Sequence, residues 1–239
     1  MEIQTPLGEN RILRSLPADE LAEVRPHLKE IILAQGDVLY RSGEEITFVY
    51  FPIAGMISLL TVMKTGEQIE TGIVGRSGVA GATIGNNGPF AFGQATVQIE
   101  GKGYQLPRDR FLALFAKAAT LRALVNAYDG YLYFQAQQSS ACHAVHTVEA
   151  RLCRWMLQCQ DVLQSDVVAL TQEFLSNMMG VQRNAVSLCA HVLQEKGLIE
   201  YSRGTIKILD RDGLKLIACE CYEATHEYTL RMSPPIESA

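Results

Sequence analysis

The sequence predicts an α+β protein with an N-terminal double-stranded β-helix (jelly-roll-like), a long helix and a C-terminal winged helix-turn-helix. Three observations predict it. Residues 33–106 hold short runs of β-branched residues separated by glycines, which is typical of strands and tight turns. Residues 121–145 follow a helical period over about seven turns. Two short amphipathic helices around a glycine, followed by a hairpin pattern, occupy the C-terminal third.

The N-terminal region is predicted to be β-rich because short apolar runs alternate with turn chemistry. Turn residues such as Gln35-Gly36-Asp37 and Thr65-Gly66 separate these runs, and a further turn is expected over 52–55. Regular spacing of short strands favours a small barrel or sandwich. The expected strands are 38–40, 48–51, 56–60, 68–71 and 96–99.

The long helical pattern carries one continuous stripe at alternating spacings of three and four residues, which is the pattern of a helix–helix seam. The stripe either packs on its own domain or forms a dimer seam, and we favour the dimer because the helix is long and its neighbours are self-contained. The expected seam residues are Leu121, Leu124, Tyr128, Tyr131, Gln135, Gln138, Cys142 and Val145.

A helix-turn-helix is predicted in the C-terminal third. Thr171 is a good N-cap for a first short helix, and Gly180 breaks that helix in the tight turn that the motif needs. A second helix is expected over 182–196, ending at Gly197, a common C-terminal cap residue. This order of a helix, a glycine turn and a second capped helix is the framework that places a recognition helix in the major groove.

The second helix separates into an apolar side and a polar side that suits base recognition. Arg183 on the polar side can bond guanine with two hydrogen bonds, and Asn184 can do the same for adenine. Ser187 can serve a base or a phosphate. The hairpin that follows, 198–201 and 205–209, is interpreted as a wing. The expected DNA-binding residues are Gln182, Arg183, Asn184, Ser187, His191, Arg203 and Lys207.

The overall charge lowers the expectation of nucleic-acid binding without excluding it. The net charge is -5, whereas nonspecific nucleic-acid binders are usually basic. Within 176–209, however, Arg183, Lys196, Arg203 and Lys207 outnumber the two glutamates. Groove binding depends on this local field, so a positive module in an acidic chain remains compatible with DNA.

These motifs resemble the Crp/Fnr family of bacterial transcription regulators. The segments 170–173, 181–186 and 193–199 resemble that family's helix-turn-helix, and 36–40 with 49–59 resembles its cyclic-nucleotide-binding-type β-roll. The resemblance covers nearly the whole chain. It implies a homodimer through the long helix, with one recognition helix for each half of a palindrome. The expected domains are a sensor over 1–118, a dimerisation helix over 119–146 and a DNA-binding domain over 147–239.

Departures from the family pattern argue against cyclic AMP in its usual pose. Cyclic-AMP-responsive members hold the ribose and phosphate with a Gly-Glu-Leu turn and an Arg-Ser pair, and the matching positions here are Gly81-Ala82-Thr83 and Gly93-Gln94. No arginine is present for the phosphate, and an unpaired, partly buried anion costs several kcal/mol. The expected effector pocket is Gly81, Ala82, Thr83, Gly93, Gln94 and Tyr131, with the effector unidentified and no cofactor assigned.

Cysteine and histidine residues leave weaker alternatives. Cys219 and Cys221, with His226 nearby, suit a metal or redox role, but a Cys-x-Cys pair shows too little of a four-ligand set, so no metal is expected. His143 and His146 lie one helical turn apart and are interpreted as solvated or capping residues, with a hinge contact as the alternative. Cys142 on the seam suits an intersubunit disulfide, which a reducing cytoplasm disfavours.

The expected function is therefore sequence-specific DNA binding rather than catalysis. A nucleophile elbow, a phosphate loop and paired catalytic carboxylates are all lacking in the sequence. Double-stranded DNA, a second copy of the chain and RNA polymerase are the expected partners, and a membrane is not. The expected location is cytoplasmic, since no signal-peptide pattern is present. The alternative is a ligand- or partner-binding β-roll protein whose winged domain serves protein interaction.

Overall fold

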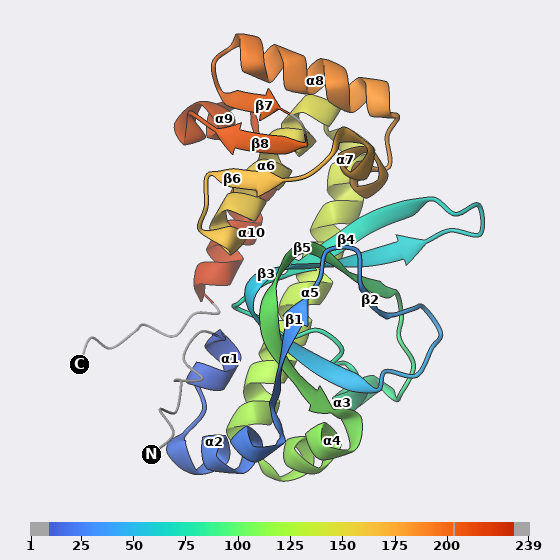
Figure 1. Cartoon of the computed structure of the whole chain (residues 1–239), viewed down its shortest axis with the longest axis vertical. Coiled ribbons are helices and arrows are strands. Elements are labelled where there is room, and N and C mark those ends of the chain that lie inside the picture. Colours follow the sequence, from blue (N-terminus) through green and yellow to red (C-terminus); the bar gives the residue numbers. More distant parts are fainter. Residues whose placement is uncertain (1–9, 203, 232–239) are drawn as a thin grey trace. The chain divides into compact units, whose positions relative to one another are not determined.

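The computed structural model describes residues 10–202 and 204–231, and these residues form two compact units (Figure 1). The first unit comprises the described residues up to Val62 together with Ile73–Gly130. The second comprises Met63–Gly72 together with the described residues from Tyr131 onward. A helix that starts in the first unit and ends in the second belongs to both.

The first unit is built on an antiparallel sheet, as the alternation of strand and turn residues predicts. The strand order is β1-β5-β3-β4, and β2 also pairs with β5. Short helices precede and follow the strands. The elements are α1 (Arg11–Arg14), α2 (Ala18–Val24), η1 (Arg25–His27), β1 (Lys29–Leu33), β2 (Val38–Tyr40), β3 (Phe48–Val62), β4 (Gln68–Val74), α3 (Ile84–Asn87), β5 (Gln94–Pro107) and α4 (Arg108–Lys117); β4 is shared, because its residues up to Gly72 belong to the second unit.

The expected turn at 52–55 is wrong: one strand, β3, runs through it. The β3–β5 register shifts at Pro52, Ala54 and Met56, so the segment is a bulged bend within a strand. Gly55 adopts φ +80°, and a Cβ there would lie 2.6 Å from the Ile99 carbonyl oxygen. The bend therefore needs glycine both for its backbone conformation and for the close approach of β5. β1 was not expected from the sequence.

The core of the first unit lies where the inward-facing residues of β3 and β5 meet α4. Phe51, Met56, Ile57, Leu106 and Phe111 are all fully buried there. Complete burial of such side chains contributes about 1.5–3 kcal/mol each relative to exposure. The pattern of apolar residues along the strands therefore positions the sheet that the sequence predicts.

The long helix α5 (Ala119–Val145) confirms the helical pattern that the sequence predicts over 121–145. Gly130 lies within it, and beyond its chain neighbours and the backbone of the helix itself, no described atom comes within 4 Å of the position that a Cβ would take there. In the part of the chain that the structure describes, no single helix is long and apolar enough to cross a bilayer. Only α4 and α5 taken together, across a bend of 109°, reach that length and composition.

The second unit is a helical domain with a small antiparallel sheet of order β6-β8-β7. The expected wing hairpin is confirmed as β7 and β8, and β6, which pairs with β8, was not expected. Trp155 anchors the residues 63–72 to this unit by donating its Nε1 hydrogen to Glu70 Oε1 at 2.9 Å. The elements are α6 (Val148–Leu163), β6 (Val167–Ala169), α7 (Gln172–Met179), α8 (Arg183–Glu195), β7 (Ile199–Ser202), β8 (Thr205–Ile208), α9 (Arg211–Ile217) and α10 (Cys221–Arg231).

Candidate DNA-reading surface and a cysteine-histidine cluster

The turn between α7 and α8 forms as its residues predict. Thr171 caps α7 by accepting a hydrogen bond from the Phe174 amide at 3.2 Å. Gly180 ends the helix in the left-handed conformation, φ +59°, and the Val181 amide donates to the Ser176 carbonyl at 3.0 Å. Capping and a left-handed glycine satisfy the free backbone groups at both ends of α7. The chain can therefore reverse within three residues and begin α8 at Arg183.

Polar side chains fix α8 and the turn to the rest of the second unit. The buried Arg151 of α6 donates to the Met179 carbonyl at the end of α7. Lys196 Nζ lies 2.9 Å from Glu149 Oε1, which ties the end of α8 to the start of α6. The Tyr201 amide donates to Gln194 Oε1 at 2.9 Å, which ties α8 to the wing. Because these contacts join α8 to α6 and to the wing, the helix has little freedom to tilt on its domain.

The two faces of α8 separate cleanly in the structure. Val186, Ala190 and Leu193 are buried, and they hold the helix on its domain. Opposite them the side chains of Gln182, Arg183, Asn184 and His191 are exposed, as the sequence predicts. Leu188 also lies exposed on α8 (66%), at the position where the resemblance to the family expects a base-contacting arginine. It offers an apolar contact of the kind that reads a thymine methyl group.

The remaining predicted DNA-binding residues differ in the contacts that their side chains already make within the domain. The Ser187 hydroxyl lies 2.5 Å from Gln172 Oε1 and 3.1 Å from the Arg183 carbonyl oxygen, so it is already used within the domain. His191 Nε2 lies 3.4 Å from Glu195 Oε1. Lys207 is exposed on β8. Arg203, the expected tip of the wing, lies outside the described residues.

Most of the residues that were expected to line an effector pocket already make contacts within the first unit. Gly81 adopts φ +82°, and Ala82 is buried. A Cβ at Gly93 would lie 2.7 Å from the Leu60 carbonyl oxygen, and the Gln94 amide donates to Thr96 Oγ1 at 3.0 Å. Thr83 precedes α3 and is partly exposed. These contacts are those of a packed β-roll wall.

Tyr131, the last expected effector residue, belongs to the second unit. Its hydroxyl accepts from Thr229 Oγ1 at 3.0 Å, and its ring stacks on Tyr228 with centroids 5.8 Å apart. Its assigned contacts are therefore with α10.

In the first unit, sequence reasoning missed a fully buried polar pair, Ser58 and Gln98, whose Oγ and Oε1 lie 3.3 Å apart.

The expected dimer seam needs correction, because the chain covers most of that face itself. Leu121, Tyr128, Gln135 and Cys142 are buried. A Cβ on Gly78 would lie 1.9 Å from the Tyr128 ring, and one on Gly72 would lie 3.7 Å from Gln135. Leu124 and Gln138 are partly exposed, and only Val145 is largely exposed (73%). The three-four spacing was correct for a buried stripe, but spacing alone does not say which surface covers it.

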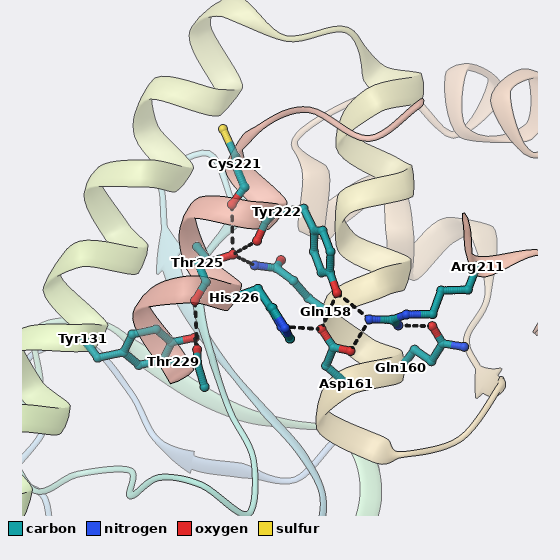
Figure 2. A network of polar contacts seen from close by, with 10 residues as sticks. All are labelled: Tyr131, Gln158, Gln160, Asp161, Arg211, Cys221, Tyr222, Thr225, His226 and Thr229. Carbon is teal, nitrogen blue, oxygen red and sulfur yellow. Dashed lines mark hydrogen bonds and ion pairs between the residues drawn. The ribbon is translucent and has the colours of Figure 1, made fainter. Parts of the chain in front are cut away.

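A polar network holds α10 against α6 and the start of α9 (Figure 2). The Asp161 carboxylate accepts hydrogen bonds from Arg211 Nη2 at 2.7 Å and from the Tyr222 hydroxyl at 2.8 Å. His226 Nδ1 also lies 3.4 Å from this carboxylate. His226 is thus paired with Asp161 and is not part of the Cys219–Cys221 set that the sequence suggested.

Near the N-terminal end of α10, the structure brings together four potential metal ligands that sequence reasoning had not grouped. They are Cys142 of α5, His146 just after the end of α5, Cys219 and Cys221, and their ligand atoms all lie within 4.8 Å of one another. Hydrogen bonding from Cys219 lowers the pKa of Cys142. His143, one turn earlier, instead contacts the Ser139 carbonyl through Nδ1 at 2.6 Å. The sequence offered two signals, the Cys219-x-Cys221 pair and the four-residue spacing of Cys142 and His146, but nothing that joined them.

Two family models match the chain, and each covers one of the expected halves. The model of the cyclic nucleotide-binding domain matches residues 30–118, and the model of the Crp-like helix-turn-helix domain matches residues 150–217. The second match spans α7, the glycine turn, α8 and the wing. A comparison with curated protein sequences finds no match.

Several solved structures have the same fold. FixK2 from Bradyrhizobium japonicum is 15% identical with a TM-score of 0.69, covering 80% of this chain and 98% of its own. A CRP-family transcriptional regulator from Thermus thermophilus is 20% identical with a TM-score of 0.65, covering 80% and 96%. The c-di-GMP-responsive global regulator CLP from Xanthomonas campestris is 13% identical with a TM-score of 0.65, covering 80% and 99%.

Proposed function

The chain belongs to the Crp/Fnr family of DNA-binding transcription regulators, which are not enzymes, and we propose that it reads a palindromic operator as a homodimer. The outer face of α8 is the observation that carries this proposal. It presents a guanidinium and a carboxamide, from Arg183 and Asn184, at the exposed N-terminal turn of the helix. In helix-turn-helix proteins this turn contacts base edges in the major groove.

The base-reading and phosphate-binding roles divide between α8 and its surroundings. Arg183 and Asn184 are assigned to bases, where each forms paired hydrogen bonds. Gln182, which precedes the helix, and Lys207 on the wing are assigned to phosphates, which position the domain without specifying sequence. Ser187 is held by Gln172 and orients α8 rather than reading a base.

The exposed face of α5 supports a homodimer and replaces the seam expected from the sequence. The exposed residues again recur every three or four positions, and most of them are small, which lets two helices approach closely. Tyr133, 66% exposed, is the large residue among them and supplies apolar area. The proposed seam consists of Ala123, Ala127, Gly130, Tyr133, Gln137, Ala141 and Ala144.

We further infer that cyclic AMP is not the effector in the pose used by cyclic-AMP-responsive relatives. Residues 77–101 contain no lysine or arginine to pair a cyclic phosphate. Ala82 is buried where a ribose-binding glutamate would be needed, and the Gln94 amide is bonded to Thr96. Leaving the anion unpaired costs several kcal/mol, which is enough to remove useful affinity.

Selection of bound duplexes from a random DNA pool by the purified full-length protein tests the function. We expect enrichment of a palindrome whose half-sites lie about 10 base pairs apart, because two α8 helices must enter successive major grooves on one side of DNA. Addition of cyclic AMP is expected to leave the selected sequence and its enrichment unchanged. Enrichment that appears only with cyclic AMP would overturn the effector inference.

A failed selection has two readings that further arms separate. The same selection is repeated with cell extract, which supplies an unidentified effector, and in low salt. Enrichment in extract alone would mean that an effector is required. If no DNA is retained even at low salt, where phosphate contacts are strongest, the winged domain is a protein-interaction module and the proposal fails.

Sedimentation of a variant with a charge on the exposed face of α5 tests the dimer. Ala127→Arg places a long cation in the proposed seam, so we expect the dimer to dissociate and half-site cooperativity to disappear. Ala113→Arg, at an exposed position of α4, is the matched control and should sediment as wild type. A dimer that persists in Ala127→Arg would contradict this seam.

A further inference from the structure

We propose that Cys142, His146, Cys219 and Cys221 form a binding site for a single thiophilic divalent cation, zinc(II) in class, with three thiolates and one imidazole as ligands. All four residues lie in the second unit, and their ligand atoms lie within 4.8 Å of one another. Cys3His is one of the ligand sets of structural zinc sites. The proposal does not depend on DNA binding.

The distances suit one ion at the centre of a tetrahedron. Cys142 Sγ lies 3.5 Å from Cys219 Sγ, and Cys221 Sγ lies 3.6 Å from His146 Nδ1. Zinc bonds of about 2.3 Å to sulfur and about 2.0 Å to nitrogen give tetrahedral edges of roughly 3.5–3.8 Å. These two separations are close to such edges, and every other pair of ligand atoms lies within 4.8 Å, so side-chain movement alone lets the four ligands close on one ion.

The same distances bear on the two other uses of a thiol cluster. Cys142 Sγ and Cys219 Sγ lie 3.5 Å apart, beyond the length of about 2.05 Å of a disulfide bond, so both thiols are free to bind a cation. All six cysteines of the chain are free. An iron-sulfur cluster places several metal and sulfide atoms between its thiolates, and ligand atoms within 4.8 Å of one another leave no room for them.

Neighbouring side chains supply the outer hydrogen bonds that metal ligands need. His146 Nε2 lies 3.1 Å from Glu220 Oε2, which leaves Nδ1 directed at the cluster. A carboxylate behind a ligating histidine fixes the orientation of the ring and raises its basicity. Gln138 Nε2 donates to Cys221 Sγ at 3.0 Å, and such a bond stabilises a thiolate. Glu220 and Gln138 are therefore already in place as hydrogen-bond partners of two of the proposed ligands.

The fold brings the ligands together from two segments and buries the three cysteines. His146 directly follows α5, and its amide donates to the Cys142 carbonyl at 3.1 Å, which keeps the two residues one helical turn apart. Cys219 and Cys221 lie at the connection between α9 and α10, where the Asp161 network holds α10 in place (Figure 2). The three cysteines are 6% exposed or less. Four protein ligands and a closed environment indicate a structural site rather than a catalytic one.

The position of the site indicates what the ion does. His146 precedes α6 by only two residues, and α6 carries Arg151, which holds the end of α7. An ion at this point ties the last turn of α5 to the α9–α10 connection. It therefore stabilises the base of the domain that presents α8, without contacting α8 itself.

Metal analysis of the full-length protein, purified without chelator and dialysed against zinc, is the first test. We expect one zinc per chain, and cobalt(II) substitution should give the intense visible bands and thiolate charge-transfer absorption of tetrahedral thiolate coordination. This measurement uses the wild-type chain, so it does not depend on the folding of any variant. Less than one tightly bound zinc, with a Cys142–Cys219 disulfide on mild oxidation, would overturn the proposal in favour of a redox pair.

Matched variants then assign the ligands. His146→Ala and Cys219→Ser should lose zinc binding and alter the cobalt spectrum. His143→Ala, on the same helix, and Cys189→Ser, in α8, should bind one zinc as wild type does. Glu220→Gln should retain the stoichiometry but weaken affinity by about 10–100-fold. Equal zinc binding in His143→Ala and His146→Ala would refute the proposed ligand set.

Discussion

Two regions of the second unit hold reactive side chains in opposite ways. On α8, Arg183 and Asn184 point to solvent. At the junction of α5 and α10, Cys142, His146 and Cys221 point toward one another. A DNA reader keeps its donors free until bases arrive, whereas a metal site gathers and orients its ligands beforehand. The second unit thus separates a surface for a macromolecule from an internal site for an ion.

The cysteines within that unit show that position decides chemistry. Burial raises the pKa of Cys159 far above its usual value and that of Cys153 to about 12, so both behave as apolar packing residues. Cys142, Cys219 and Cys221 are also buried, but their sulfurs lie within 4.8 Å of one another and of a ring nitrogen of His146. Geometry therefore separates the isolated packing cysteines from those of the cluster.

The largest expected effect comes from removing the ion. Chelation should lower the free energy of unfolding by about 4 kcal/mol, if free zinc had exceeded its dissociation constant about a thousandfold. Urea denaturation at fixed zinc, with and without chelator, measures this. Cys189→Ser should show the same loss and Cys142→Ser should show none. A chelator effect that survives in Cys142→Ser would place the ion elsewhere.

Arg183→Ala should have the next largest effect, and it should change DNA binding without changing the stability of the protein. We expect a loss of about 1–3 kcal/mol in binding free energy and relaxed preference at one base of each half-site. The urea midpoint should not change, because Arg183 is exposed. Repeating the duplex selection with the variant measures its base preferences. An unchanged preference would show that Arg183 does not contact a base.

Lys207→Ala should weaken DNA binding more evenly. A phosphate contact carries no sequence information, so the selected palindrome should stay the same while affinity falls for all duplexes. The slope of log affinity against log salt should decrease in magnitude by about 0.9 for each phosphate that the variant no longer neutralises. Titrations at several salt concentrations test this, and a changed base preference would assign Lys207 to a base instead.

Ser187→Ala should have the smallest effect, within about 0.5 kcal/mol for stability as for most changes away from special features. Its hydroxyl is already used by Gln172 and by the Arg183 carbonyl. Base preference should therefore be retained. A new preference at one position in the duplex selection would restore Ser187 to the base-reading set that the sequence suggested.

Local chemistry made the DNA-reading half largely predictable. Thr171, Gly180 and Gly197 act through capping and backbone conformation within a few residues, so the order helix, turn, helix and hairpin can be read along the chain. The N-terminal region was less predictable. Pro52 and Gly55 resemble a turn in sequence but form a bulged bend, because β5 continues to pair on both sides of them.

The sequence by itself determined the α+β class, the long helix and the polar face of α8, since helical and strand periods and caps depend on neighbouring residues. Only the tertiary structure decided which face of α5 is covered, since a stripe of spacing three and four fits either a core or a partner. It also decided that Cys142 meets Cys219, 77 residues further along. That meeting depends on the path of the whole chain between them, which no local pattern records.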